Sequence, residues 1–186
     1  MQTIFETERL FVRAATLADI DLYLKLWTDP RVMKNVGFPN GLQITRAELE
    51  KRLASNPDRE RLLAVCLKPT GESIGECAIH PPDENGIAST DVKLLPQFWG
   101  NKFGVEIKRG LLDHLFAHTD CLAVEATPNV DNMASIKMQE AVGGARVREE
   151  VFEFPDSMKA YTTPVHCYVY RVARAVWEAQ NRKSLA

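Results

Sequence analysis

The most informative segment of the chain is Leu94-Leu95-Pro96-Gln97-Phe98-Trp99-Gly100-Asn101-Lys102-Phe103-Gly104-Val105-Glu106. An apolar strand runs there into a turn with two glycines, and an amphipathic helix starts at once. Glycine lets the main chain approach a ligand closely. The first N–H groups of a helix have no partner inside the helix and carry a partial positive charge, so they attract anions. The segment therefore predicts a main-chain cradle for a pyrophosphate.

A strand, a glycine turn and a helix also form an ordinary connection in α/β proteins, so this segment alone is weak evidence for phosphate binding. A second candidate lies downstream. The short strand Cys121–Ala126 is followed by Thr127-Pro128-Asn129-Val130-Asp131-Asn132-Met133-Ala134-Ser135, which opens a helix. That helix ends at Gly143-Gly144. A cofactor site would then be bounded by the N-termini of two helices.

The first third of the chain predicts one strand and two helices. Thr7–Ala14 alternates enough between apolar and polar residues to be a strand. Each helix begins with a capping-box pattern, at Thr16–Asp19 and at Thr45–Glu48. The second helix should stop before Pro57, because the residue before a proline disfavours helical geometry. Residues 36–41 between the helices read as a loop.

Three antiparallel strands are predicted next, at Leu62–Leu67, Ser73–His80 and Ile87–Leu95. Short connectors rich in proline and glycine separate them, which is typical of neighbouring antiparallel strands. Apolar residues at every fourth position, Ile107, Leu111 and Leu115, predict a helix over Gly104–His118 that packs on the sheet. The strand Cys121–Ala126 follows it. Such a β-α-β crossover is right-handed and makes its two strands parallel.

The C-terminal part predicts a helix, a hairpin and a last helix. The glycine pair at 143–144 suits a left-handed cap of the helix that opens near Asn132. Val147–Phe154 and Pro164–Val172 form the hairpin, and Ala173–Arg182 a short terminal helix. The expected fold class is α/β (α+β), with a mixed, mostly antiparallel sheet of about seven strands and helices on both faces. Residues 1–186 are expected to form one domain.

Composition limits the possible functions. A chain of 186 residues with 45% hydrophobic content can bury one sizeable core. The formal net charge of −2 and a pI near 6.1 provide no basic surface, so nucleic acid is not an expected partner. No apolar run approaches the roughly 20 residues that a membrane span needs. Residues 1–6 also lack a secretory pattern. We therefore expect a cytoplasmic protein that does not bind membranes.

The cysteines and histidines do not predict a metal site. Four cysteines lie in apolar, strand-like segments, and none follows a C-x-x-C spacing, so we expect buried, reduced thiols. His114 and His118 lie four residues apart on the expected helix. No Glu or Cys completes a metal-binding set beside them, so no metal is expected.

Five segments together resemble a known superfamily. They are the junction 94–106, Asn132-x-x-Ser135, Thr7-Glu8-Arg9-Leu10-Phe11-Val12-Arg13, residues 26–33 and residues 165–171. Their order and spacing are similar to those of the GNAT superfamily of acyl-CoA-dependent N-acetyltransferases. More narrowly, they resemble the branch that contains the ribosomal-protein N-terminal acetyltransferases. The resemblance covers nearly the whole chain, and it implies a central strand pair that splays apart and acetyl-CoA as the acetyl donor.

The resemblance also implies which residues contact the cofactor. The family's cradle pattern, R/Q-x-x-G-x-G/A, aligns with residues 99–104, with Trp99 at the Arg/Gln position and Lys102 where glycine is expected. Lys102 would either crowd the backbone or reach a phosphate. In the family, main chain at the end of the preceding strand binds the acetyl carbonyl and the pantetheine arm. The implied cofactor-binding residues are Leu94, Leu95, Trp99, Gly100, Asn101, Lys102, Phe103, Gly104, Val105 and Asn132.

Catalysis requires a proton source for the departing thiolate. The resemblance implies that Ser135 is this general acid and that Asn132 contacts the pantetheine arm. Both residue types are also common at helix starts for local reasons.

The general base is less clear from the sequence. The family's glutamate position is Ser89 here. Asp91 lies two residues further on the same side of the strand, and it could act through a water molecule. Glu76 and His80 on the preceding strand are alternatives.

The acceptor amine would be selected by the first two helices, the loop 36–42 and the last hairpin. The branch resemblance implies a peptide N-terminus, while other relatives acetylate small-molecule amines. An acidic cluster in the hairpin connection would attract a cationic amine or simply be solvated; it comprises Glu149, Glu150, Glu153 and Asp156. Monomer and homodimer both remain open. Ser89 and Lys102 at the expected glutamate and glycine positions also suggest an alternative, a non-catalytic module that binds or senses acyl-CoA.

Overall fold

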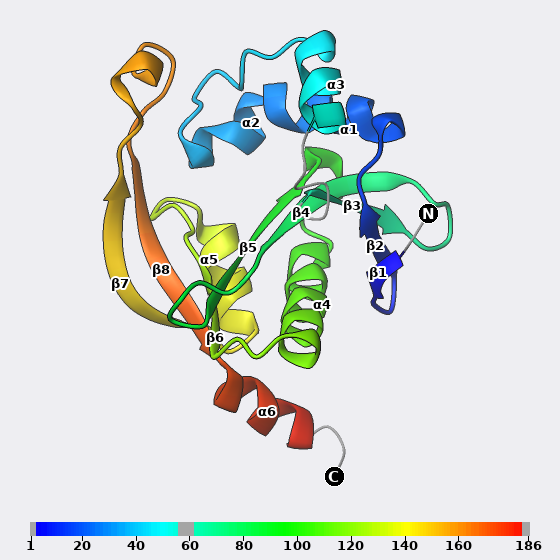
Figure 1. The fold of residues 1–186 in the computed structure, drawn as a ribbon, viewed down its shortest axis with the longest axis vertical. Coiled ribbons are helices and arrows are strands. Elements are labelled where there is room, and N and C mark those ends of the chain that lie inside the picture. Colours follow the sequence, from blue (N-terminus) through cyan, green and yellow to red (C-terminus); the bar gives the residue numbers. More distant parts are fainter. Residues whose placement is uncertain (1–2, 56–61, 184–186) are drawn as a thin grey trace.

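The computed structural model describes residues 3–55 and 62–183, and its described strands form one sheet in the order β1-β2-β3-β4-β5-β6-β8-β7 (Figure 1). The strands are β1 Thr3–Glu6, β2 Leu10–Ala14, β3 Leu62–Leu67, β4 Ser73–His80, β5 Ile87–Leu94, β6 Ala123–Ala126, β7 Ala145–Phe152 and β8 Val165–Ala173. The helices are α1 Ile20–Thr28, α2 Pro30–Met33, α3 Arg46–Ser55, α4 Phe103–His118, α5 Met133–Ala141 and α6 Arg174–Lys183.

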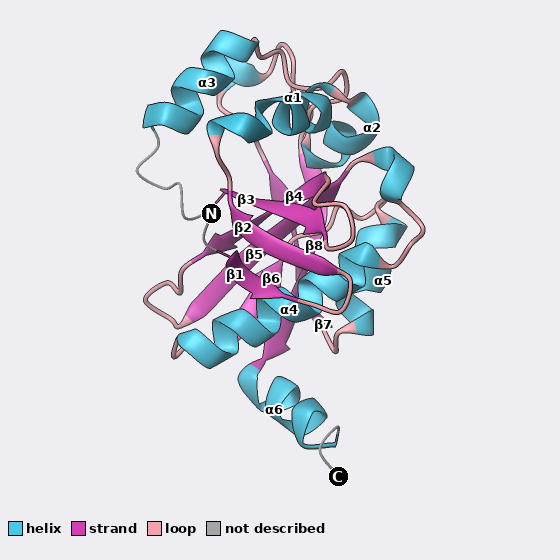
Figure 2. Ribbon diagram, turned by 90° about the vertical axis from the view of Figure 1, so that its right-hand side faces the viewer, coloured by secondary structure: helices cyan, strands magenta, loops and turns pink. Residues whose placement is uncertain are grey.

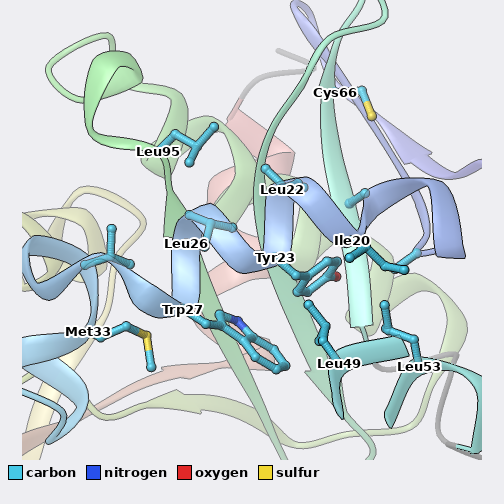
Figure 3. Packing of buried hydrophobic residues seen from close by; sticks show 13 residues of the cluster. Ile20, Leu22, Tyr23, Leu26, Trp27, Met33, Leu49, Leu53, Cys66 and Leu95 are labelled. Carbon is cyan, nitrogen blue, oxygen red and sulfur yellow. The ribbon is translucent and has the colours of Figure 1, made fainter. Parts of the chain in front are cut away.

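Helices cover both faces of the sheet, and strand β3 shows how the sequence divides them. Successive side chains of a strand point to opposite faces. Leu63 and Val65 pack with α4, whereas Ala64 and Cys66 pack in the cluster formed by α1, α2 and α3. Figure 2 shows these two helical layers on either side of the strands. In Figure 3, Tyr23 of α1 lies beside Leu49 and Leu53 of α3.

The pairing of β5 with β6 is parallel, and every other pairing of the described strands is antiparallel. It joins Ile87 to Ala123, Ala88 to Val124 and Ser89 to Glu125, and it then stops. The rest of β5, from Thr90 onward, continues to pair with β4 on its other side. The two strands therefore diverge, as Figure 1 shows in the upper half of the sheet. This confirms the expected fold class and its splayed central strand pair.

The sheet has one more strand than the seven expected. The predicted first strand Thr7–Ala14 is wrong at its start, because residues 7–9 form a turn between β1 and β2. The turn closes when Thr7 N donates to Leu10 O at 2.9 Å. A distant residue also holds it, since Glu106 accepts from Thr7 Oγ1 at 2.6 Å and from Arg9 N at 2.8 Å. No local pattern could show this contact.

Both predicted capping boxes are present. Thr16 and Asp19 cap a 3-10 turn that leads into α1, and Thr45 and Glu48 cap α3. Asp19 also accepts two hydrogen bonds of 2.7 Å from the guanidinium of Arg13, and both residues are buried. Pro57 lies outside the described residues.

The other boundaries agree with the predictions to within about two residues, except that α2 was not expected. Pro30 is its first residue, and the side chain of Asp29 caps it. At the end of α5, Gly143 has φ +84° and donates to Glu140 O, while Gly144 donates to Gln139 O. These two bonds form the predicted left-handed cap. Within the described part of the chain, no helix combines the length and the apolar character of a membrane span.

Candidate active site

The turn before α4 has the geometry of an anion cradle. Gly100 has φ +79°, and a Cβ built on it would meet nothing within 4 Å, so the main chain there is open to a ligand. Lys102 is the N-cap of the 16-residue helix α4, and its side chain makes no capping hydrogen bond to the described residues. The first N–H groups of α4, on Phe103, Gly104 and Val105, therefore lack a side-chain acceptor. Free N–H groups at a helix start suit the diphosphate of a nucleotide cofactor.

The turn is closed by its own side chains. Asn101 Nδ2 donates to Phe98 O and to Trp99 O, both at 3.2 Å. Trp99 Nε1 donates to Leu94 O at 2.8 Å, while about half of its side chain stays exposed. Two of the predicted contact residues thus shape the cradle through their side chains.

Arg9 holds the cradle from outside, and the sequence did not single it out. Its guanidinium pairs with Glu106 at 2.6 Å, donates to Asn101 O at 3.2 Å and lies 4.4 Å from the centre of the Phe103 ring. Burial acts to raise the pKa of Glu106, but the hydrogen bonds from Thr7 and Arg9 outweigh it and lower that pKa. The only sequence signal for Arg9 was its place in the segment 7–13.

Lys102 adopts the left-handed conformation, with φ +62° and ψ +11°. It is the one non-glycine residue with positive φ among those described. The position therefore has the backbone for which glycine is best suited, and lysine supplies it with strain of about 1–2 kcal/mol. The side chain is exposed.

Replacing Lys102 by glycine is expected to raise the free energy of unfolding by about 1 kcal/mol, because the strain disappears. Lys102→Ala is the matched control, since it removes the charge and keeps the strained conformation. If the ammonium reaches a phosphate, both variants should bind coenzyme A at least about tenfold more weakly. Chemical denaturation and calorimetry measure the two effects separately. A less stable glycine variant would contradict the strain argument.

The main chain of Leu94 faces the divergence of β5 and β6. In an antiparallel pair, alternate residues point their polar groups at the partner strand. Leu95 N donates to Ile74 O at 3.0 Å, and Leu95 O accepts from Phe98 N at 2.9 Å, so both groups are engaged. Leu94 consequently directs its N–H away from β4, toward the side that β6 has left. The structure thus brings Leu94 to the opening, but not the main chain of Leu95.

Helix α5 begins on the same side of the sheet as α4. Asn132 is its N-cap, and Asn132 Oδ1 accepts from Ser135 N at 3.2 Å. Both side chains are half-buried. A Cβ on Gly104 would lie 3.1 Å from Met138 Sδ, so the glycine allows α4 and α5 to pack closely. The two predicted helix starts therefore flank one region, as Figure 1 also shows.

The carboxylates predicted as bases lie around Lys93, on the face of the sheet that α1 covers and opposite to α4 and α5. Glu76 is 5% exposed, and its two oxygens each lie 3.0 Å from Trp27 Nε1, while one lies 3.1 Å from Lys93 Nζ. Asp91 also pairs with Lys93, and its side chain is 45% exposed. Burial acts to raise the pKa of Asp91, but the charge of Lys93 outweighs it and lowers that pKa.

Ser89, at the expected glutamate position, lies opposite a different glutamate. Its partner in the parallel pair is Glu125, which is buried and forms ion pairs with Arg148 of β7 and Arg171 of β8. Sequence reasoning missed Glu125, because only the register of β5 and β6 places it beside Ser89.

The predicted acceptor elements come together. Thr163 N, beyond β7, donates to Gly37 O at 2.9 Å, and the rings of Phe38 and Phe154 are 5.4 Å apart. The loop 36–42 therefore contacts the connection of the last hairpin. Half of the predicted acidic cluster is not in that connection, because Glu149 and Glu150 lie within β7 and pair with basic side chains. Glu153 and Asp156 do lie between β7 and β8.

The four cysteines are buried free thiols, as expected. The described residues contain no group of three or more side chains suited to bind a metal ion. Two shallow hollows, with volumes of about 480 and 430 Å³, lie beside the 3-10 turn before α1, and neither is lined by a predicted site residue.

Comparison with known proteins agrees with this geometry. Residues 9–145 match the family described as "Acetyltransferase (GNAT) domain". The "Uncharacterized N-acetyltransferase p20" of Bacillus licheniformis is 30% identical over 142 residues, which cover 74% of this chain and 79% of that protein.

Two solved structures share the fold. An acetyltransferase of the GNAT family from Bacillus anthracis superimposes with a TM-score of 0.76 at 18% identity, covering 94% of this chain and 99% of that one. Spermidine N-acetyltransferase from Vibrio cholerae, in complex with CoA and spermine, gives a TM-score of 0.74 at 18% identity, with coverages of 91% and 98%. Because the family match spans well over half of the chain, the protein belongs to the GNAT family of acetyltransferases, enzymes that take the acetyl group they transfer from acetyl-CoA.

Proposed function

We propose that the protein is an N-acetyltransferase that moves the acetyl group of acetyl-CoA directly to a primary amine. One observation carries this proposal: the uncapped start of α4 and the unpaired edge of β5 beyond Ser89 belong to one continuous segment. A cofactor whose phosphates bind at the start of α4 would extend along the unpaired edge of β5. The proposed unit is a single domain of residues 1–186, and its four free thiols suit the cytoplasm.

The cradle and the strand edge would hold the cofactor by main-chain contacts. The N–H groups of Phe103, Gly104 and Val105 would bind the pyrophosphate, and Leu94 N–H would hold the thioester carbonyl. Asn132 would contact the pantetheine arm through its amide group. Bound acetyl-CoA supplies the activated acetyl group.

Proton transfer is assigned to two side chains. Ser135, at the start of α5, would give a proton to the leaving sulfur. Asp91 would accept the proton of the amine through a water molecule. Both carboxylates pair with Lys93, but the Asp91 side chain is 45% exposed, whereas Glu76 is buried and its oxygens also accept from Trp27 Nε1. The exposure of Asp91 therefore supports this choice. The lowered pKa keeps Asp91 ionised at neutral pH.

Two acceptor classes fit the proposal. The resemblance to the ribosomal-protein branch favours a peptide N-terminus, and the Vibrio relative was solved with the small amine spermine. The contact between the loop 36–42 and the hairpin connection is the part of this chain that would choose between them. The proposed function is compatible with a monomer and with a homodimer.

Calorimetry with coenzyme A, followed by thiol release from acetyl-CoA with a panel of peptides and small amines, tests the proposed function. We expect binding and thiol release with at least one acceptor. Binding without thiol release on any acceptor would instead support the non-catalytic acyl-CoA module. Absence of binding would refute both functions.

The base assignment is tested by replacing each carboxylate with its amide. Asp91→Asn is expected to lower kcat at least about tenfold, because the proton acceptor is lost. Glu76→Gln is expected to lower the free energy of unfolding by about 1–3 kcal/mol, because Lys93 loses a charged partner. Steady-state kinetics measures kcat, and chemical denaturation measures the free energy of unfolding. A larger fall in kcat for Glu76→Gln than for Asp91→Asn would assign the base to Glu76.

A further inference from the structure

Lys108 is a buried cation that the proposed mechanism does not use. It lies on α4 and is 1% exposed. Lys108 Nζ donates to Thr90 Oγ1 of β5 at 2.6 Å, and in the described structure it has no carboxylate within ion-pair distance. A buried ammonium whose partner is a neutral hydroxyl is energetically unfavourable.

The surroundings of Lys108 explain how it titrates. Burial lowers the pKa of its ammonium to about 7, and the charge of Asp91 opposes this shift from the other face of β5. From β4, Cys77 faces the same layer, and burial raises the pKa of its thiol, so that it stays neutral. The buried residues of α5, Ile136 and Gln139, are uncharged, and so is Val124 of β6. We therefore expect Lys108 to change its charge near neutral pH.

The position of Thr90 in β5 indicates what Lys108 does. Thr90 is the first residue of β5 after the last pair with β6, Ser89 with Glu125. Beyond this residue, the main-chain groups of Val92 and Leu94 face the side that β6 has left. Lys108 thus holds β5 at the closed end of the divergence. It does so from the same helix whose first turn forms the phosphate cradle.

We propose that Lys108, acting through Thr90, is a positioning residue for acetyl transfer: it fixes β5 where the strand leaves β6 and so sets the place of the thioester. This inference rests on the proposed function. The charged form makes the stronger hydrogen bond to Thr90. It also places a positive field at the closed end of the divergence, which favours negative charge on the leaving sulfur. A buried, strongly shifted group beside a site is a candidate for function, because it lowers stability.

The variants Lys108→Met and Thr90→Val remove the two partners at nearly constant volume. Each is expected to lower kcat about tenfold, with the KM for acetyl-CoA and the affinity for coenzyme A within about twofold of wild type, because the cradle is untouched. Thr90→Ser keeps the hydroxyl and should recover most of the loss. The double variant should be no slower than Lys108→Met, because the two residues act as one unit.

The pH dependence separates positioning from packing. Wild-type kcat should fall with a midpoint near pH 7 as Lys108 loses its proton, and Lys108→Met should lack this step. Independently of activity, the free energy of unfolding of wild type should rise from pH 7 toward pH 10, because the unfolded state then binds the additional proton. This rise should be smaller in Lys108→Met.

Three results would overturn the inference: wild-type kcat in a folded Lys108→Met, an unaffected Thr90→Val, or additive losses in the double variant. If the wild-type protein acetylates no acceptor, the proposed function fails and this inference fails with it. If wild type is active and Lys108→Met is equally active, only the inference fails.

Discussion

Replacing Ser135 by alanine is expected to lower kcat for acetyl transfer at least about tenfold, while the affinity for coenzyme A stays near that of wild type. The hydroxyl sits in the first turn of α5, and its main-chain N–H is already held by Asn132. In the described structure Ser135 Oγ has no hydrogen-bond partner, so it is available to a ligand. Thiol-release kinetics and calorimetry measure the two quantities.

Variants of Asn132 provide the matched control for the helix start. Asn132→Asp keeps a good N-cap and loses the amide N–H groups, whereas Asn132→Ala loses both. The alanine variant should be less stable by about 1 kcal/mol, and the aspartate variant should not. If Asn132 contacts the pantetheine arm, both should bind coenzyme A more weakly. A Ser135→Ala variant with wild-type kcat would remove Ser135 from the mechanism.

Replacing Asp19 by alanine is expected to lower the free energy of unfolding by about 3–5 kcal/mol, the largest effect on stability that we expect. The substitution leaves the guanidinium of Arg13 buried without its bidentate partner. It also removes the capping box before α1. Chemical denaturation at neutral pH measures the loss. The control is Asp21→Ala, because Asp21 pairs with Arg46 at an exposed site and its loss should cost about 0–1 kcal/mol.

The difference between wild type and Asp19→Ala should depend on pH. Burial acts to raise the pKa of Asp19, but the hydrogen bonds from Arg13 and Thr16 outweigh it and lower that pKa. A carboxyl with a lowered pKa stabilises the fold above its unfolded pKa, which is about 3.9. The contribution is lost as the pH falls through the folded pKa. The two proteins should therefore converge below about pH 4, and a constant difference down to pH 2 would contradict this account.

Elements that depend on local patterns could be predicted from the sequence. The strands Leu62–Leu67 and Ser73–His80 have the predicted bounds, and Ile107, Leu111 and Leu115 are buried as their spacing indicated. Period-2 and period-3.6 patterns record which face is buried. Contacts between distant residues left no such record. The turn before β2 depends on Glu106, almost 100 residues away, and no pattern marked it.

The site shows the same division. The cradle and the start of α5 could be located from glycine and cap residues, but their partners could not. The spacing of Lys108 from Leu111, Leu112 and Leu115 places it on the apolar face of α4. Its full burial and its contact with Thr90 depend on where α4 crosses β5, which the sequence does not show. Glu125 became a neighbour of Ser89 only through the strand register.

The short pairing of β5 with β6 has a mechanical consequence. Three residue pairs join strands β1–β5 to strands β6–β8, and α4 packs on both parts of the sheet. One side of this helix packs on β2, β3 and β4 through Ile107 and Leu111, and the other packs on β6 and β8 through Leu112 and Leu115. We therefore expect a ligand bound at the start of α4 to restrict the movement of the two parts of the sheet relative to each other. Cofactor binding should then stiffen the whole sheet through this one helix.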